Sequence, residues 1–174
     1  MKYEESQEFR QSRVNFKNMI QNLADMYPYG VDEVVLVECI ANSLDARASE
    51  IEISFDPRRK ILAVSDNGKG MTQDQFEQYH DFAMGLKTRG EGIGFAGLGA
   101  KISFNIAHCV VTETRSTSFA GASLWEFDED GSLGWKAIPL RHSLERGTRV
   151  EIHFNDDAEI HYSTTEDIKQ VILR

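Results

Sequence analysis

Apolar and polar residues alternate along several stretches of the chain, which predicts strands. Residues 51–55 alternate as a half-buried strand does, and residues 61–65 are typical of a more buried strand. Residues 56–60 between them predict a turn, so we expect the two strands to form a hairpin. Four later stretches have the strand pattern and would extend this sheet: 108–114, 122–127, 133–138 and 149–154.

Other stretches favour helices. We expect helices at residues 6–26, 32–47, 72–82, 100–107 and 164–174. Asp32 and Thr72 are candidate N-caps, and Pro28 and Gly30 end the first helix because both residue types break helices. The last helix stops abruptly, as though the chain continued into a further domain.

A polar stripe runs along the second predicted helix. Glu38, Asn42 and Asp45 are spaced i, i+4 and i+7, which places them on one helix face. Asparagine is a poor helix former, and the two carboxylates repel each other unless a cation or hydrogen-bond donors lie nearby. The alternative is an ordinary solvated face. Four apolar side chains are expected to point toward the core instead: Val37, Ile40, Ala41 and Leu44.

Asp66 follows a buried strand and is succeeded by glycines at alternate positions, Gly68 and Gly70. This arrangement places a carboxylate at the end of the sheet and lets the backbone pass close to a planar or charged ligand. A simple glycine turn would explain the same residues. Gly147 and Thr148 precede the last predicted strand and place a hydroxyl at a sheet end, although ordinary turn chemistry also accounts for this pair.

The stretch 84–99 contains five glycines between Gly90 and Gly99 and leads into the helix predicted at 100–107. Glycine-rich backbone before a helix N-terminus presents free N–H groups, which favours phosphate binding. We therefore predict a mobile loop that covers a ligand. A flexible linker is the alternative, but apolar residues interleave with the glycines and argue against it.

Composition restricts the classes of protein that fit. The 174 residues suffice for one well-buried domain, and the formal net charge of −9 argues against direct nucleic-acid binding. No apolar run approaches the roughly 20 residues that span a bilayer. We therefore expect a cytoplasmic protein without membrane contact, or a nuclear one if the organism is eukaryotic. Cys39 and Cys109 lack the number and spacing of a disulfide framework or metal site and are expected to be buried thiols.

Two common glycine motifs do not fit this chain. Gly92-x-Gly94-x-x-Gly97 matches the dinucleotide fingerprint, but the stretch before it is not a buried strand. The spacing from Gly94 to Gly99 is that of a P-loop, but Ala100 stands where that motif needs lysine.

A third pattern fits. Glu38-x-x-x-Asn42-x-x-Asp45-Ala46, then Asp66-x-Gly68-x-Gly70, then Gly97-Leu98-Gly99, then Gly147-Thr148 occur in the order found in the GHKL superfamily of ATP-binding domains. The chain resembles that superfamily over residues 31–154. The resemblance implies an α/β (α+β) two-layer sandwich, with a mixed, mostly antiparallel sheet and helices on one face, known as the Bergerat fold. It implies ATP and Mg²⁺ as cofactors.

The resemblance also assigns the adenine pocket. Asp66 would accept a hydrogen bond from the exocyclic amine of adenine, and Gly70 and Thr148 would complete the base pocket directly or through water. Gly68 belongs to the same motif and is assigned to the nucleotide site. Met71 would pack near the base.

The phosphates and metal would lie nearer the second helix. Asn42 would bind Mg²⁺, for which an amide oxygen is a suitable ligand. Asp45 would lie near the nucleotide, and Lys87 is a candidate phosphate contact. The phosphate cradle would comprise Gly97, Leu98, Gly99, Ala100 and Lys101.

Glu38 distinguishes branches of the superfamily. In the hydrolysing branches, a glutamate four residues before the Mg²⁺-binding asparagine orients or deprotonates the attacking water. The resemblance therefore implies a slow Mg²⁺-dependent ATPase with Glu38 as the catalytic residue, most similar to MutL and MORC proteins. A protein kinase module of histidine-kinase type and a regulatory module that binds ATP without hydrolysing it remain alternatives.

We expect three parts along the chain: an N-terminal helical extension (1–30), the ATP-binding domain (31–156) and a C-terminal tail (157–174) that leads to a further domain. Closure of the lid over ATP or ADP would be coupled to homodimerisation of the full-length protein or to that domain.

Overall fold

One antiparallel sheet organises the molecule. The computed structural model describes residues 14–81 and 99–174. Six strands form the sheet in the order β1-β2-β6-β3-β4-β5, and every neighbouring pair is antiparallel. The strands are β1 (Ile51–Asp56), β2 (Ile61–Asp66), β3 (Ala107–Arg115), β4 (Ala120–Phe127), β5 (Leu133–Ile138) and β6 (Gly147–Phe154). All six predicted strands are confirmed, and the described pairs are antiparallel throughout, not mixed.

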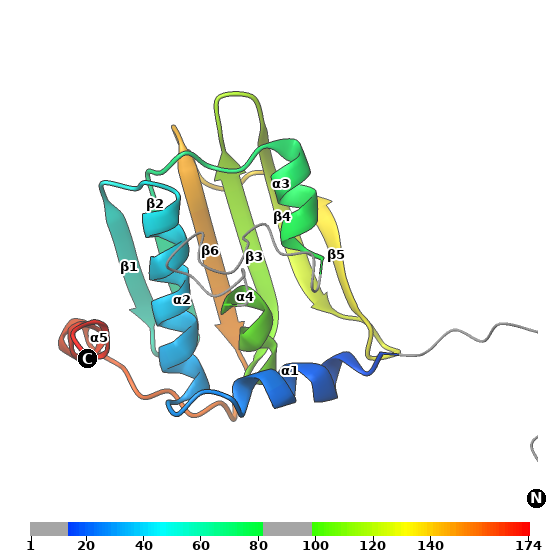
Figure 1. Ribbon diagram of the computed structural model, residues 1–174, viewed down its shortest axis with the longest axis vertical. Helices are drawn as coiled ribbons and strands as arrows, with labels where there is room; N and C mark the ends of the chain where they lie inside the picture. Colours follow the sequence, from blue (N-terminus) through cyan, green and yellow to red (C-terminus); the bar gives the residue numbers. More distant parts are fainter. Residues whose placement is uncertain (1–13, 82–98) are drawn as a thin grey trace, which may run out of the picture.

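The helices lie over one face of this sheet, so the predicted two-layer α/β sandwich is confirmed (Figure 1). They are α1 (Phe16–Ala24), α2 (Val31–Asp45), α3 (Gln73–Tyr79), α4 (Gly99–Ile102), the 3₁₀ turn η1 (Ser103–Asn105) and α5 (Thr165–Ile172). Among the described residues, no helix has the length and apolar character needed to cross a bilayer.

The core lies between the two layers. Leu62, Val110, Trp125 and Ile152 point from the sheet toward the helices and are fully buried. The C-terminal stretch contributes to the same core through Tyr162, and Ile168 and Val171 of α5 are also buried there.

Several predicted boundaries were wrong. Thr72 caps α3 as expected, but α2 is capped at Gly30, and Asp32 is buried within its first turn. The helix predicted at 100–107 ends with η1, because residue 107 already pairs with β6. Gly147 and Thr148 lie inside β6, not before it.

The faces of α2 also differ from expectation. Val37 and Leu44 are 48% and 46% exposed, so the prediction that they point toward the core was wrong. The core side is formed by Val35, Leu36 and Cys39. The polar stripe adjoins this side, and Glu38 within it is buried because α4 packs against the helix there. The side opposite the core is left to solvent.

Candidate functional site

A cavity of about 340 Å³ opens between α2, α3 and the ends of β2 and β6. Its volume is within the range of small-molecule sites. Seven of the predicted site residues line it: Asn42, Asp45, Asp66, Gly70, Met71, Ala100 and Thr148. The other lining residues are Cys39, Ser43, Ala46, Val64, Lys69, Gln75, Tyr79 and Val150. The structure therefore brings together motif pieces that are far apart in the sequence.

Asp66 is the buried carboxylate of this cavity. Its Oδ1 accepts hydrogen bonds from the backbone N–H groups of Gly68 (2.8 Å) and Thr148 (3.3 Å), and its Oδ2 accepts one from the Ser43 hydroxyl (3.0 Å). Burial raises the pKa of Asp66, and these three hydrogen bonds oppose the rise. A carboxylate offers about four lone-pair sites. Oδ2 thus retains capacity to accept a further hydrogen bond from a ligand in the cavity.

Two glycines allow the backbone to close around Asp66. Gly70 has φ +66°, and a Cβ there would lie 2.1 Å from the carbonyl oxygen of Arg115. Gly147 has φ +116°, and a Cβ there would lie 1.8 Å from the carbonyl oxygen of Asp66. Both positions combine a left-handed backbone with a contact that no side chain fits.

Thr114 of β3 connects the loop after β2 to the start of β6 through hydrogen bonds. Its hydroxyl accepts a hydrogen bond from the backbone N–H of Met71 (2.9 Å), donates one to the carbonyl of Gly147 (3.2 Å) and lies 3.0 Å from the Thr148 hydroxyl. Because Thr114 has a single proton and uses it on Gly147, Thr148 is the donor in the third bond. The lone pairs of the Thr148 oxygen are then left for a ligand.

Comparison with known proteins identifies the family of this chain. Residues 29–132 match the family described as histidine kinase-, DNA gyrase B-, and HSP90-like ATPase, which covers more than half of the chain. The chain belongs to this ATPase family. The superfamily resemblance is thereby confirmed, and the family implies that the chain binds ATP.

The curated proteins similar to this chain include chaperones. A chaperone protein HtpG from Mesorhizobium japonicum is 30% identical over 82% of this chain and 27% of its own length. The endoplasmin homolog of Dictyostelium discoideum is 25% identical over 90% of this chain and 24% of its own length. The mitochondrial TNF receptor-associated protein 1 homolog of the same organism is 27% identical over 95% of this chain and 24% of its own length. The chain thus spans about a quarter of these relatives, and none of the three is a MutL or MORC protein.

Four of the predicted site residues that the structure describes do not line the cavity: Glu38, Gly68, Gly99 and Lys101. Glu38 is buried on α2 against α4, where a Cβ at Gly99 would lie 2.5 Å from the Glu38 Cβ. The Gly99 backbone therefore approaches α2 one turn before Asn42. Lys101 is also buried, its ammonium donates to the carbonyl of Asp81, and burial lowers its pKa. Lys87, Gly97 and Leu98 lie outside the described residues, and the phosphate contacts stay predictions.

Sequence reasoning missed Ser43 and Thr114. Ser43 lies on the core side of α2, one turn after Cys39, and its hydroxyl contacts both the Cys39 carbonyl (3.1 Å) and Asp66. A lone hydroxyl on an otherwise apolar helix face was the signal that could have found it. Thr114 lies in a strand rich in threonine and valine, and nothing local distinguishes it from a strand former.

Proposed function

We propose that this chain is a module that binds ATP with Mg²⁺ and hydrolyses it slowly. The observation that carries the proposal is the buried Asp66 carboxylate, which lines the cavity. Its Oδ2 atom accepts one hydrogen bond, from Ser43, and can accept another from a ligand. The exocyclic amine of adenine is a donor of the matching kind. Ser43, Gly68 and Thr148 hold the carboxylate in one orientation, which preorganises it for a planar base.

The residues present also suit Mg²⁺. Asn42 and Asp45 lie on the same side of α2 and both line the cavity. Their amide and carboxylate oxygens are hard ligands, which Mg²⁺ prefers while it keeps several of its waters. When bound, Mg²⁺ would supply positive charge that offsets the charge of the phosphates. The net charge of −9 makes such local compensation necessary, because the field of the whole chain repels a polyphosphate.

Glu38 is proposed as the residue that orients or deprotonates the attacking water. It precedes Asn42 by one turn of α2, so the two residues lie on the same face of the helix. Burial beneath α4 keeps bulk water from this carboxylate. We further propose that the stretch from about residue 85 closes over the nucleotide, and that closure is coupled to dimerisation or to a downstream domain.

The experiment is calorimetric titration of ATP into the chain with Mg²⁺, followed by phosphate release from the same samples. Wild type should bind ATP and release phosphate slowly. Asp66→Asn should weaken binding roughly 10- to 100-fold, because its amide N–H₂ would face the adenine amine in place of an acceptor. Asp157→Asn makes the same chemical change at an exposed position and should bind as wild type does.

Glu38→Ala separates binding from hydrolysis. It should retain ATP binding and lose phosphate release, whereas Glu129→Ala in an exposed turn should change neither. Wild-type chain that is folded by circular dichroism but binds no adenine nucleotide would overturn the proposal. Labelled γ-phosphate found on protein would favour a kinase, and turnover unchanged in Glu38→Ala would remove that residue from catalysis.

A further inference from the structure

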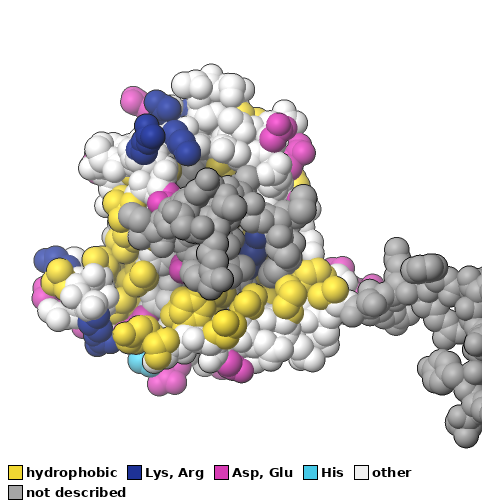
Figure 2. All heavy atoms as spheres, in the orientation of Figure 1, with side chains coloured by type: hydrophobic (Ala, Val, Ile, Leu, Met, Phe, Trp, Pro, Cys, Tyr) yellow, Lys and Arg dark blue, Asp and Glu magenta, His cyan; other side chains and the backbone are white. Residues whose placement is uncertain are grey.

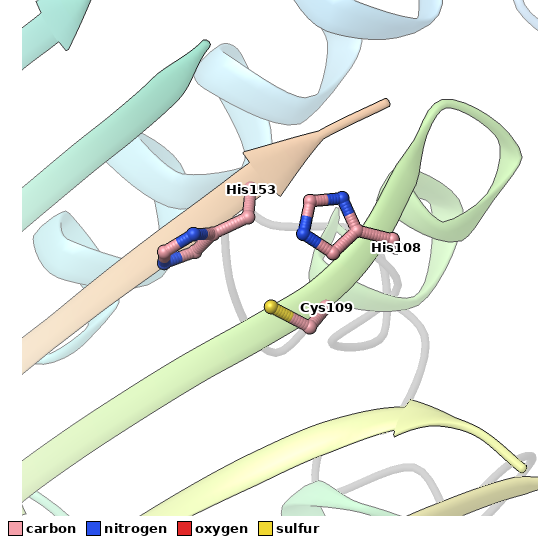
Figure 3. A group of neighbouring side chains, drawn as sticks. All are labelled: His108, Cys109 and His153. Carbon is pink, nitrogen blue, oxygen red and sulfur yellow. The ribbon is translucent and has the colours of Figure 1, made fainter. Parts of the chain in front are cut away.

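A second group of chemically active side chains lies away from the cavity. His108 and Cys109 of β3 and His153 of β6 each offer one donor atom, and these three atoms all lie within 4.8 Å of one another (Figure 3). Ile152 and Phe154 point into the core, so His153 between them points to the opposite face of the sheet. This group is therefore on the face that the helices leave uncovered.

An irregularity in β3 brings the three together. Ala107 pairs with Phe154 and Cys109 pairs with His153, so His108 is an extra residue in the ladder between β3 and β6. In a regular strand His108 and Cys109 would point to opposite faces. A β-bulge changes this alternation and re-aims one side chain, which here places both residues beside His153.

The histidine of β6 also has an unmet bonding need. The Nε2 atom of His153 is buried and has no hydrogen-bond partner among the described residues, and the nearest carboxylate oxygen, on Glu151, is 3.6 Å away. Glu151 is itself engaged by Arg141 (2.9 Å) and Arg149 (3.0 Å). A buried ring nitrogen without a hydrogen-bond partner destabilises the folded protein. The imidazole nitrogens of histidine are common metal ligands, so a bound metal ion would satisfy this atom.

We propose that His108, Cys109 and His153 form a Zn²⁺ site. Two imidazole nitrogens and one thiolate are the donor types that Zn²⁺ takes in tetrahedral sites. Bond lengths of about 2.0–2.3 Å in a tetrahedron put the donors about 3.3–3.6 Å apart. The three donor atoms now lie up to 4.8 Å apart, and small side-chain rotations would bring them to that separation. Water would complete the fourth position.

Binding would exchange one proton for the metal. Burial, with Glu126 as a smaller cause, raises the pKa of Cys109 to about 11, so the side chain is a thiol until Zn²⁺ displaces its proton. The bound ion would cross-link β3 to β6, the two central strands. Thr114 and Thr148 mark the cavity at the other end of these strands, so the metal site is separate from the nucleotide site and does not depend on its assignment.

Cobalt is a suitable probe, because tetrahedral Co²⁺ sites absorb visibly and a Co²⁺–thiolate bond adds a charge-transfer band. The untagged chain should develop both signals on addition of one equivalent of Co²⁺, and Zn²⁺ should abolish them. Cys109→Ser should lose the charge-transfer band. Cys39→Ala removes the other cysteine of the chain and should keep it, which makes it the matched control.

Zn²⁺ affinity gives a second measurement. His108→Gln and His153→Gln should each weaken Zn²⁺ binding by about 100-fold in calorimetry. His108 is exposed, so its variant tests the site even if changes at the half-buried Cys109 or His153 prevent folding. Absence of the cobalt bands in folded wild type, or a band that persists in Cys109→Ser, would overturn the proposal. Binding of copper without zinc would overturn the choice of metal.

Discussion

The two glycines of the loop after β2, Gly68 and Gly70, are required by contacts within the protein. The sequence suggested that Gly68 and Gly70 let the backbone pass close to a ligand. In the structure, the nearest atoms to a Cβ at these positions are the carbonyl oxygens of Ala46 (2.7 Å) and Arg115 (2.1 Å). The glycines therefore let the loop after β2 pack against α2 and the end of β3, and this packing holds Asp66 at the cavity.

Substitution of Gly70 tests that interpretation. Gly70→Ala should lower the free energy of unfolding by about 2–4 kcal/mol, because a left-handed φ is strained for alanine and its Cβ would collide with the Arg115 carbonyl. Gly131 also has a left-handed φ (+77°), but nothing lies within 4 Å of a Cβ there. Gly131→Ala should therefore cost only about 1 kcal/mol. Urea unfolding of both variants measures the difference, and equal losses would contradict the steric argument.

At the scale of elements, the start of α2 is held by the stretch that follows β6. Asp32 is buried and accepts hydrogen bonds from the backbone N–H of His161 (2.6 Å) and from its ring Nδ1 (2.8 Å). These bonds raise the pKa of His161 above its usual 6.5, chiefly through the side-chain bond to Asp32 and its charge. The side chain expected to cap α2 thus connects that helix to the C-terminal stretch.

This connection makes stability depend on pH. Because the pKa of His161 is higher in the folded state, its contribution is complete below about pH 6.5 and is lost as pH rises through the folded pKa. His161 is 46% exposed, so solvent screening limits the effect to under about 1 kcal/mol. Urea unfolding at about pH 5.5 and about pH 8.5 should show the loss, and His161→Gln should remove it. If His161→Gln keeps the full pH dependence of the unfolding free energy, a group other than His161 causes it.

At the scale of the whole molecule, apolar side chains are exposed on the face that carries the helices. Figure 2 shows hydrophobic side chains along α2 and toward α1, and Met26, Tyr29, Val37 and Leu44 are among the exposed large hydrophobic residues. Exposed apolar surface of this kind is found where another chain or domain associates.

The proposed coupling of lid closure to dimerisation predicts a nucleotide-dependent mass. Gel filtration with multi-angle light scattering should show the monomer without nucleotide and a species of twice the mass with Mg²⁺ and a non-hydrolysable ATP analogue. Asp66→Asn, which should bind the analogue poorly, serves as the control and should stay monomeric. An unchanged mass for wild type at saturating analogue would count against coupling in this chain while leaving ATP binding intact.

Local sequence determined the elements and the motif residues of this protein. Alternation placed all six strands, and the helical spacing of Glu38, Asn42 and Asp45 put them on one side of α2. Asp66 was recognisable because it ends a buried strand before two alternating glycines. These features depend on residues within a few positions of one another, and such short-range patterns follow from backbone geometry alone.

Tertiary structure alone decided how these pieces meet. The register of β6 pairs Thr148 with Asp66 on one side and with Thr114 on the other, which closes one side of the cavity. The bulge in the same ladder brings His108 and Cys109 to His153. No local pattern specifies a register between strands this far apart in the chain, because it is set by which faces are buried when the whole sheet packs.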